Sequence, residues 1–132
     1  MTLRQKATEM TMFSAKAATG VSTVFNVSDY RNITLIFGTA SSANLTIKFQ
    51  ASASDTCPDF SAAQSVSNHW DYVQVFDYQS GLGIDGDTGI SCAGTDDFRL
   101  LNVNTDYIKW LSASVTARSA GSVTLKAVAA SD

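Results

Sequence analysis

The sequence predicts an all-β fold: an antiparallel β-sandwich, jelly-roll-like or Greek key, with about 8–10 short strands. Three observations support this prediction. Apolar and polar residues alternate along most of the chain, as they do in strands that bury one face. Turn-forming residues separate these segments at short intervals, and no long segment shows helical periodicity. The composition, with one Glu and one Pro among 132 residues and many Ser, Thr, Val and aromatic residues, favours strands over helices.

The length of the chain fits one domain with a buried core. We expect a single β-sandwich domain over residues 8–132, with a possible N-terminal arm over residues 1–12 that reaches an adjacent subunit. The N-terminal residues contain no continuous apolar stretch, so no signal peptide is expected, and no apolar run is long enough to cross a bilayer.

The alternation identifies the individual strands. In residues 43–54, Leu45, Ile47 and Phe49 fall on one side of the expected strand. Residues 110–118 and 122–129 repeat this pattern, and residues 119–121 between them are predicted to form a tight hairpin turn because Gly121 supplies a positive φ. The other strands are expected at 8–15, 20–27, 31–38, 70–77 and 97–103, the turns at 17–20, 38–43, 77–83 and 102–106, and at most one helical turn within 60–70.

Charge is distributed unevenly along the chain. Residues 49–98 contain eight aspartates and no Lys or Arg, whereas residues 1–48 carry a net charge of +3 and residues 99–132 one of +2. One interpretation is that copies attract each other head to tail, an acidic rim against a basic face. The other is a solvated acidic edge that keeps the protein soluble. The Lys and Arg residues do not cluster, which argues against nucleic-acid binding.

The tripeptide DTG at residues 87–89 matches the active-site sequence of retropepsin-like aspartic proteases, which pair two such aspartates. That family places the tripeptide after an apolar strand, but here GIDG (83–86) precedes it. The apolar-apolar-Gly segment that should follow occurs only upstream, as IFG (36–38). A hairpin connection with Asp85-Gly86 as its two-residue turn fits this segment better.

The same segment offers carboxylate ligands for calcium. Asp85, Asp87 and Asp96 fall at positions 1, 3 and 12 of a twelve-residue frame, but Ile90 occupies position 6, where an EF-hand needs Gly. An EF-hand is therefore excluded, and a looser loop site formed by Asp85, Asp87, Asp96 and Asp97 stays open as an alternative. The sequence assigns no cofactor.

Catalytic chemistry has little support elsewhere. His69 is the only histidine, so a triad would have to use it with Asp71 or Cys57, and no nucleophile motif accompanies them. Cys57 and Cys92 lack the spacing of zinc ligands, and we expect two reduced thiols, with one disulfide as the alternative. The chain is therefore predicted not to be an enzyme.

Several aromatic residues offer a binding chemistry. They could form a platform on which sugar rings stack, or they could serve as anchors in the core of the sandwich. The residues concerned are Trp70, Tyr72, Tyr78, Tyr107 and Trp110.

Three segments carry a resemblance to a known group of proteins: VFNVSDYRNITLIFGTASSANLTIKFQASAS (24–54), CPDFSAAQSVSNHWDYVQVFDY (57–78) and WLSASVTARSAGSVTLKAVA (110–129). They resemble small β-sandwich virion accessory proteins encoded among the structural genes of tailed bacteriophages and prophages. The resemblance implies a capsid decoration (cement) protein, or a small head or tail protein, that stabilises the shell through contacts between subunits.

The resemblance also implies partners and a location. The partners would be the major capsid protein or other virion subunits, in a homo-oligomer with a trimer favoured, without nucleic acid or membrane. The location would be the virion, after synthesis in the host cytoplasm. The alternative is a carbohydrate- or Ca-binding β-sandwich module of a fibre or an extracellular protein.

Overall fold

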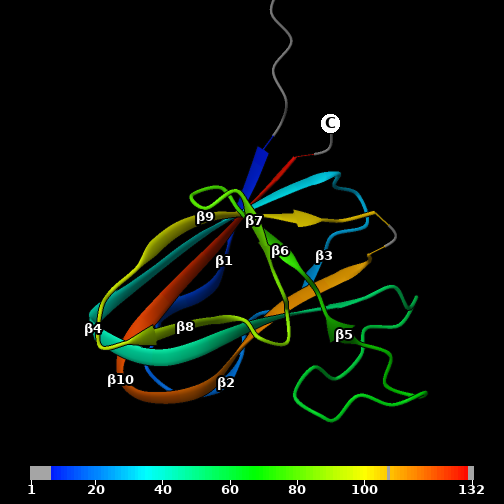
Figure 1. Ribbon diagram of the computed structural model, residues 1–132. Helices are drawn as coiled ribbons and strands as arrows, with labels where there is room; N and C mark the ends of the chain where they lie inside the picture. Colours follow the sequence, from blue (N-terminus) through cyan, green and yellow to red (C-terminus); the bar gives the residue numbers. More distant parts are fainter. Residues whose placement is uncertain (1–6, 107, 131–132) are drawn as a thin grey trace, which may run out of the picture.

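The computed structural model describes residues 7–106 and 108–130, which form strands, turns and loops (Figure 1). Within these residues no helix is long and apolar enough to cross a membrane. The strands of the described residues are β1 (Ala7–Lys16), β2 (Gly20–Val21), β3 (Phe25–Asn26), β4 (Asn32–Ser52), β5 (Asp71–Tyr72), β6 (Val75–Asp77), β7 (Leu82–Ile84), β8 (Ile90–Ala93), β9 (Phe98–Asn104) and β10 (Trp110–Ala130).

All ten described strands belong to one antiparallel sheet that does not close on itself. Its main order is β1-β10-β4-β9-β6-β7, with β2 and β3 paired to β10, and β5 and β8 paired to β4. The predicted all-β antiparallel class is confirmed. The pairing does not delineate the two separate sheets of a sandwich, because β4 and β10 run through the whole molecule and connect its two halves.

The pairing of β4 with β10 is the longest in the sheet. Each strand has 21 residues, and the pairing runs from Trp110 opposite Ser52 to Ala130 opposite Asn32. Both strands turn a corner halfway along, at the lower left of Figure 1. The register shifts at this corner, which shows that the strands bend through β-bulges rather than ending there.

The predicted turn at 38–43 and the predicted hairpin turn at 119–121 are therefore wrong. Ser41 and Ser42 have positive φ angles of 65° and 52°, and Gly121 has a φ of 75°. These conformations form the corner, and beyond it each strand continues to pair with the same partner strand. A Cβ atom on Gly121 would lie 2.5 Å from the Cα of Ala43, so the two bends are in contact.

One side of both long strands supplies the core on each side of the corner. The burial alternates along each strand up to the corner, stops over residues 38–42 and 116–122, and resumes at Ala43 and Val123 on the side that carries the core residues of the other half. The bend unites these side chains in one hydrophobic cluster. The predicted alternation holds over 43–49, 111–115 and 123–129, whereas residues 116–118 are exposed. The core residues of the two strands are Ile33, Leu35, Phe37, Ala43, Leu45, Ile47, Phe49, Ala51, Leu111, Ala113, Val115, Val123, Leu125, Ala127 and Ala129.

Several shorter elements differ from the prediction. Residues 20–27 form β2 and β3, and residues 70–77 form β5 and β6, each pair separated by a short break. The sequence did not indicate β7 and β8. Residues 60–70 contain no helical turn. Of the possible arm at 1–12, residues 1–6 lie outside the described residues, and the rest belongs to β1, which pairs with β10.

The segment 53–70 is the longest stretch of the described chain without a named strand, and it folds back onto the sheet. The Gln50 Nε2 donates a hydrogen bond to the Phe60 carbonyl oxygen at 3.1 Å, and the Trp70 indole N–H donates to the Ala62 carbonyl oxygen at 3.0 Å. The side chains of Phe60 and Trp70, which belong to this segment, are buried. This segment therefore covers the outer side of β4 in the half that contains Gln50.

We predict that Gly121→Ala lowers the free energy of unfolding by about 2 kcal/mol or more, because it adds a steric clash to an unfavourable positive φ. Urea denaturation measures this change. Gly94→Ala is the control, since Gly94 has a φ of 86° but no atom within 4 Å of the added Cβ. A smaller loss, of about 1 kcal/mol, is expected there. Equal losses in the two variants would contradict the close contact at the corner.

Candidate interaction surface

The DTG tripeptide lies in the turn between β7 and β8. The Gly89 N–H donates a hydrogen bond to the Asp85 carbonyl oxygen at 2.8 Å, and Gly89 has a φ of 67°. A Cβ atom on Gly89 would lie 2.1 Å from the Ile47 carbonyl oxygen, which explains why glycine occupies this position. The expected two-residue hairpin at Asp85-Gly86 is wrong, because β7 pairs with β6 whereas β8 pairs with β4.

The four aspartates considered for calcium do not form one cluster. The Asp85 Oδ1 accepts a hydrogen bond from the Asp87 N–H at 2.8 Å, and the Asp87 Oδ1 lies 3.1 Å from the Lys48 Nζ. Asp96 and Asp97 lie just before β9 and make other contacts. Within residues 7–106 and 108–130, no group of three or more His, Cys, Asp or Glu side chains is placed so that it could hold a metal ion.

Asp96 holds the bend of β4. Its Oδ1 accepts a hydrogen bond from the Ala43 N–H at 2.9 Å, and its Oδ2 accepts one from the Ser42 N–H at 3.2 Å. The Thr39 hydroxyl adds a longer contact of 3.4 Å. The bond from Ala43 is the main cause that lowers the pKa of Asp96 below its ordinary value, and the bonds from Ser42 and Thr39 add to it against the opposing effect of burial.

Many charges of the acidic stretch are neutralised within the chain. The buried carboxylate of Asp77 pairs with the Arg99 guanidinium, whose Nε lies 2.7 Å from the Asp97 Oδ2. Lys109 pairs with Asp55. With the ion pair between Lys48 and Asp87 at the DTG turn, four of the eight aspartates of residues 49–98 have a cationic partner. Half of the carboxylates in the predicted acidic rim are therefore paired with cationic side chains of the same chain.

Asp77 connects β6, β9 and the following turn. Burial raises the pKa of its carboxyl group, but the Gln79 N–H, the Ser80 hydroxyl and the Arg99 guanidinium outweigh this effect and hold the pKa below the ordinary value. The Asp77 carboxylate is therefore stabilised in its charged form at the point where β6 joins the sheet.

Among the described residues, the remaining chemical candidates do not form a hydrogen-bonded group. The side chain of His69 is exposed, and in the described part of the chain no hydrogen bond joins it to Asp71 or Cys57. Cys57 is exposed and Cys92 is buried, and both are free thiols, in agreement with the expected reduced state. Burial raises the pKa of the Cys92 thiol.

The aromatic residues do not form a common platform. Trp70 is buried, and the Trp110 indole N–H donates to the Ser54 carbonyl oxygen at 3.0 Å, so both anchor the segment 53–70. Tyr72 lies against Trp70 in an edge arrangement with ring centres 5.2 Å apart. Tyr78 is exposed on another part of the sheet, and Tyr107 lies outside the described residues.

An exposed apolar area lies on the outer side of β4, β9 and β6, and we call it the apolar sheet face. It comprises Ile36, Phe76, Tyr78, Phe98 and Leu100. Leu100 lies opposite Ile36, and Phe76 packs edge-on against Tyr78 with ring centres 5.5 Å apart. Phe98 is 64% exposed. Exposed apolar side chains that adjoin one another commonly mark a contact with another molecule.

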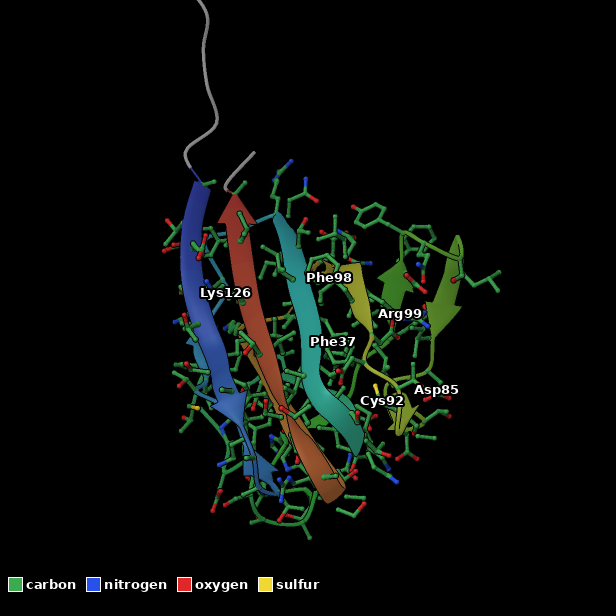
Figure 2. All side chains as sticks on the ribbon, turned by 90° about the vertical axis from the view of Figure 1, so that its left-hand side faces the viewer. Phe37, Asp85, Cys92, Phe98, Arg99 and Lys126 are labelled. Atoms are coloured by element: carbon green, nitrogen blue, oxygen red, sulfur yellow. The ribbon has the colours of Figure 1, made fainter. Side chains whose placement is uncertain are left out.

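Phe98 borders a shallow hollow on this face. Its ring lies over Gly38, which lies opposite it in β4, and the hollow of about 220 Å³ extends to Lys126 on β10. Figure 2 views this side of the sheet, with β1, β10 and β4 side by side and Phe98 and Lys126 labelled. The Lys126 Nζ lies 3.5 Å from the Glu9 carboxylate, so the border of the hollow is charged but locally neutral.

The alternation within β9 is a sequence signal that predicts the apolar sheet face. Leu101 and Val103 are buried, and they fix which side of β9 points inward. Phe98 and Leu100 must then point outward, because successive side chains of a strand alternate. An apolar residue on both sides of one strand predicts that both sides are covered, one by the core and the other by something else.

The described strands define an all-β fold that also occurs in proteins of prophage origin. The crystal structure of the SPBc2 prophage-derived protein YomS superposes with a TM-score of 0.73 at 13% sequence identity, covering 98% of this chain and 97% of YomS. The PBSX exported protein XepA superposes with a TM-score of 0.69 at 10% identity, covering 98% of this chain and 39% of XepA. No protein-family model matches the chain, and no curated protein matches its sequence. These likenesses establish the fold.

We predict that Asp96→Asn lowers the Tm at pH 7 and weakens the loss of stability in acid. The pKa of Asp96 is lowered by folding, so its contribution is complete above the ordinary aspartate pKa of about 3.9 and is lost as the pH falls below that value. Thermal denaturation between pH 7 and pH 3 measures both effects.

Asp29→Asn, an exposed aspartate between β3 and β4, is the control for the change of charge. Its Tm should follow that of the unmodified protein over the same pH range. The role of Asp96 at the bend would be refuted by an Asp96→Asn variant whose Tm curve coincides with that of the control.

Proposed function

We propose that this chain is a non-enzymatic structural subunit of a bacteriophage or prophage particle, and that it packs against neighbouring subunits through the apolar sheet face. The exposure of adjoining aromatic and aliphatic side chains on β4, β9 and β6 is the observation that carries this proposal. Burying a side chain such as phenylalanine or leucine at an interface contributes about 1.5–3 kcal/mol when burial is complete.

The shape of this face supports a protein partner. A sheet side is broad and gently twisted, and it suits the packing of a second sheet or a flat protein surface. The ion pair of Lys126 with Glu9 at its border leaves no excess charge to oppose such packing. Aromatic residues are also enriched in the central part of protein interfaces.

The fold likeness to two prophage-derived proteins supports the phage setting. Within that setting we propose capsid decoration as the role, with the major capsid protein or other virion subunits as partners and the virion as the location. A homo-oligomer, with a trimer favoured, would present several copies of the apolar sheet face to the shell.

A second candidate is a binding module of a fibre or an extracellular protein. The description of XepA as an exported protein favours it. The form of this candidate that binds calcium has weaker support, because Asp85, Asp87, Asp96 and Asp97 already accept hydrogen bonds from backbone or cationic groups of the chain.

We predict that the double variant Phe98→Ser with Leu100→Ser reduces self-association, or binding to purified capsid shells, at least tenfold, because it removes the apolar contacts of the face. Size-exclusion chromatography with light scattering and co-sedimentation with the shells measure the two outcomes. The fold should be kept, since both side chains point to solvent.

Val66→Ser provides the matched control. Val66 is 90% exposed at the tip of the 53–70 segment, so the variant removes an exposed apolar side chain away from the apolar sheet face. Its assembly should equal that of the unmodified chain. A protein that stays monomeric and does not sediment with shells would refute the structural role, and equal effects of the two variants would refute the assignment of the face.

A further inference from the structure

A cleft of about 360 Å³ lies on the other half of the sheet, where the 53–70 segment approaches β2 and β10. Its walls and floor include Gly20, Gln50, Phe60, Ser61, Tyr72 and Ser114. Gly20 and Ser114 belong to strands, whereas Phe60 and Ser61 belong to the covering segment. The cleft lies away from the apolar sheet face, so an inference about it does not depend on the proposed assembly role.

Gln50 is the notable residue of this cleft. It points to the outer side of β4, but the covering segment leaves it only 2% exposed. Its Nε2 donates to the Phe60 carbonyl oxygen at 3.1 Å, whereas its Oε1 has no hydrogen-bond partner within the described residues. A buried acceptor without a partner is unfavourable, and such groups in native proteins call for an explanation.

The groups around Gln50 define what could supply the missing hydrogen bond. The ligand must donate a hydrogen bond to Oε1. The Ser114 hydroxyl can donate or accept a further bond, and the Ser61 hydroxyl, which donates to the Asp59 Oδ1, can accept one. The rings of Phe60 and Tyr72 add apolar surface to the same cleft. A pyranose sugar combines hydroxyl donors along its edge with apolar C–H groups on its face.

We propose that this cleft binds a neutral sugar unit of a polysaccharide, with Gln50 Oε1 accepting a hydrogen bond from a sugar hydroxyl. The volume is at the lower end of the range of small-molecule sites. Because Oε1 is not accessible to water, residues 60–63 shift outward as the hydroxyl enters. The hydrogen bond from Gln50 to Phe60 couples that shift to the occupied cleft.

Titration of the full ¹⁵N-labelled chain with glucose and with N-acetylglucosamine tests this proposal. We expect saturable shifts of the Gln50 side-chain amide, the Trp70 indole and the backbone amides of residues 60–63. For a ligand of about a dozen heavy atoms, the expected Kd is on the order of 1 mM. Absence of saturable shifts for both sugars at about tenfold higher concentration would overturn the proposal.

Variants localise the binding. Ser114→Leu fills the cleft and should weaken binding at least tenfold, whereas Thr116→Leu, an exposed change at the bulge two residues further along β10, should leave the Kd unchanged. Gln50→Met removes the acceptor at similar length and should also abolish the shifts. If this variant does not fold, the Ser114→Leu variant alone tests whether the sugar binds in this cleft. Shifts that persist in Ser114→Leu would place the sugar elsewhere and overturn the assignment.

Discussion

The pairing of β4 with β10 is the constraint on which the rest of the structure depends. In the described sheet, β1, β2 and β3 attach to β10, β5, β8 and β9 attach to β4, and only β6 and β7 extend the sheet further. The two long strands are far apart in the sequence, so their pairing must close a loop of many residues before the other strands have a template. A shift of one residue in this register would turn the core side chains of the shifted strand outward.

The corner in these strands requires specific chemistry. A bulge frees backbone N–H groups, and these need partners when they lie within a packed sheet. Asp96 supplies acceptors for two of them, while Gly121 lets β10 approach the bend of β4. The aspartates of the acidic stretch have a similar role elsewhere, since Asp77 and Asp87 meet Arg99 and Lys48 of other strands. Much of the uneven charge along the sequence is therefore balanced in the fold.

The sequence predicted the buried sides of the long strands because alternation is a local property that the sheet preserves. It could not distinguish a turn from a bulge at Ser41, Ser42 or Gly121, since both use the same positive φ angles. The difference depends on the partner strand, whose register is not local. The sequence did not predict the short strands β7 and β8 for a related reason. Their composition is not typical of strands, and they are strands because they pair with β6 and β4. The DTG tripeptide shows that a turn containing a glycine with positive φ can match a catalytic motif by chance.

The corner also divides the outer side of the sheet into two areas with different properties. On the half that contains Phe98 and Leu100, apolar side chains are exposed, and no segment of residues 7–106 or 108–130 covers them. On the half that contains Gln50, residues 53–70 cover the strand and enclose polar as well as apolar groups. Both areas lie on β4 and β10 and their neighbours, and the inward side chains of these two strands pack in the core. Variation of the outer side chains can therefore change what the protein contacts without altering the fold, which is consistent with the fold that this chain shares with YomS at 13% and with XepA at 10% sequence identity.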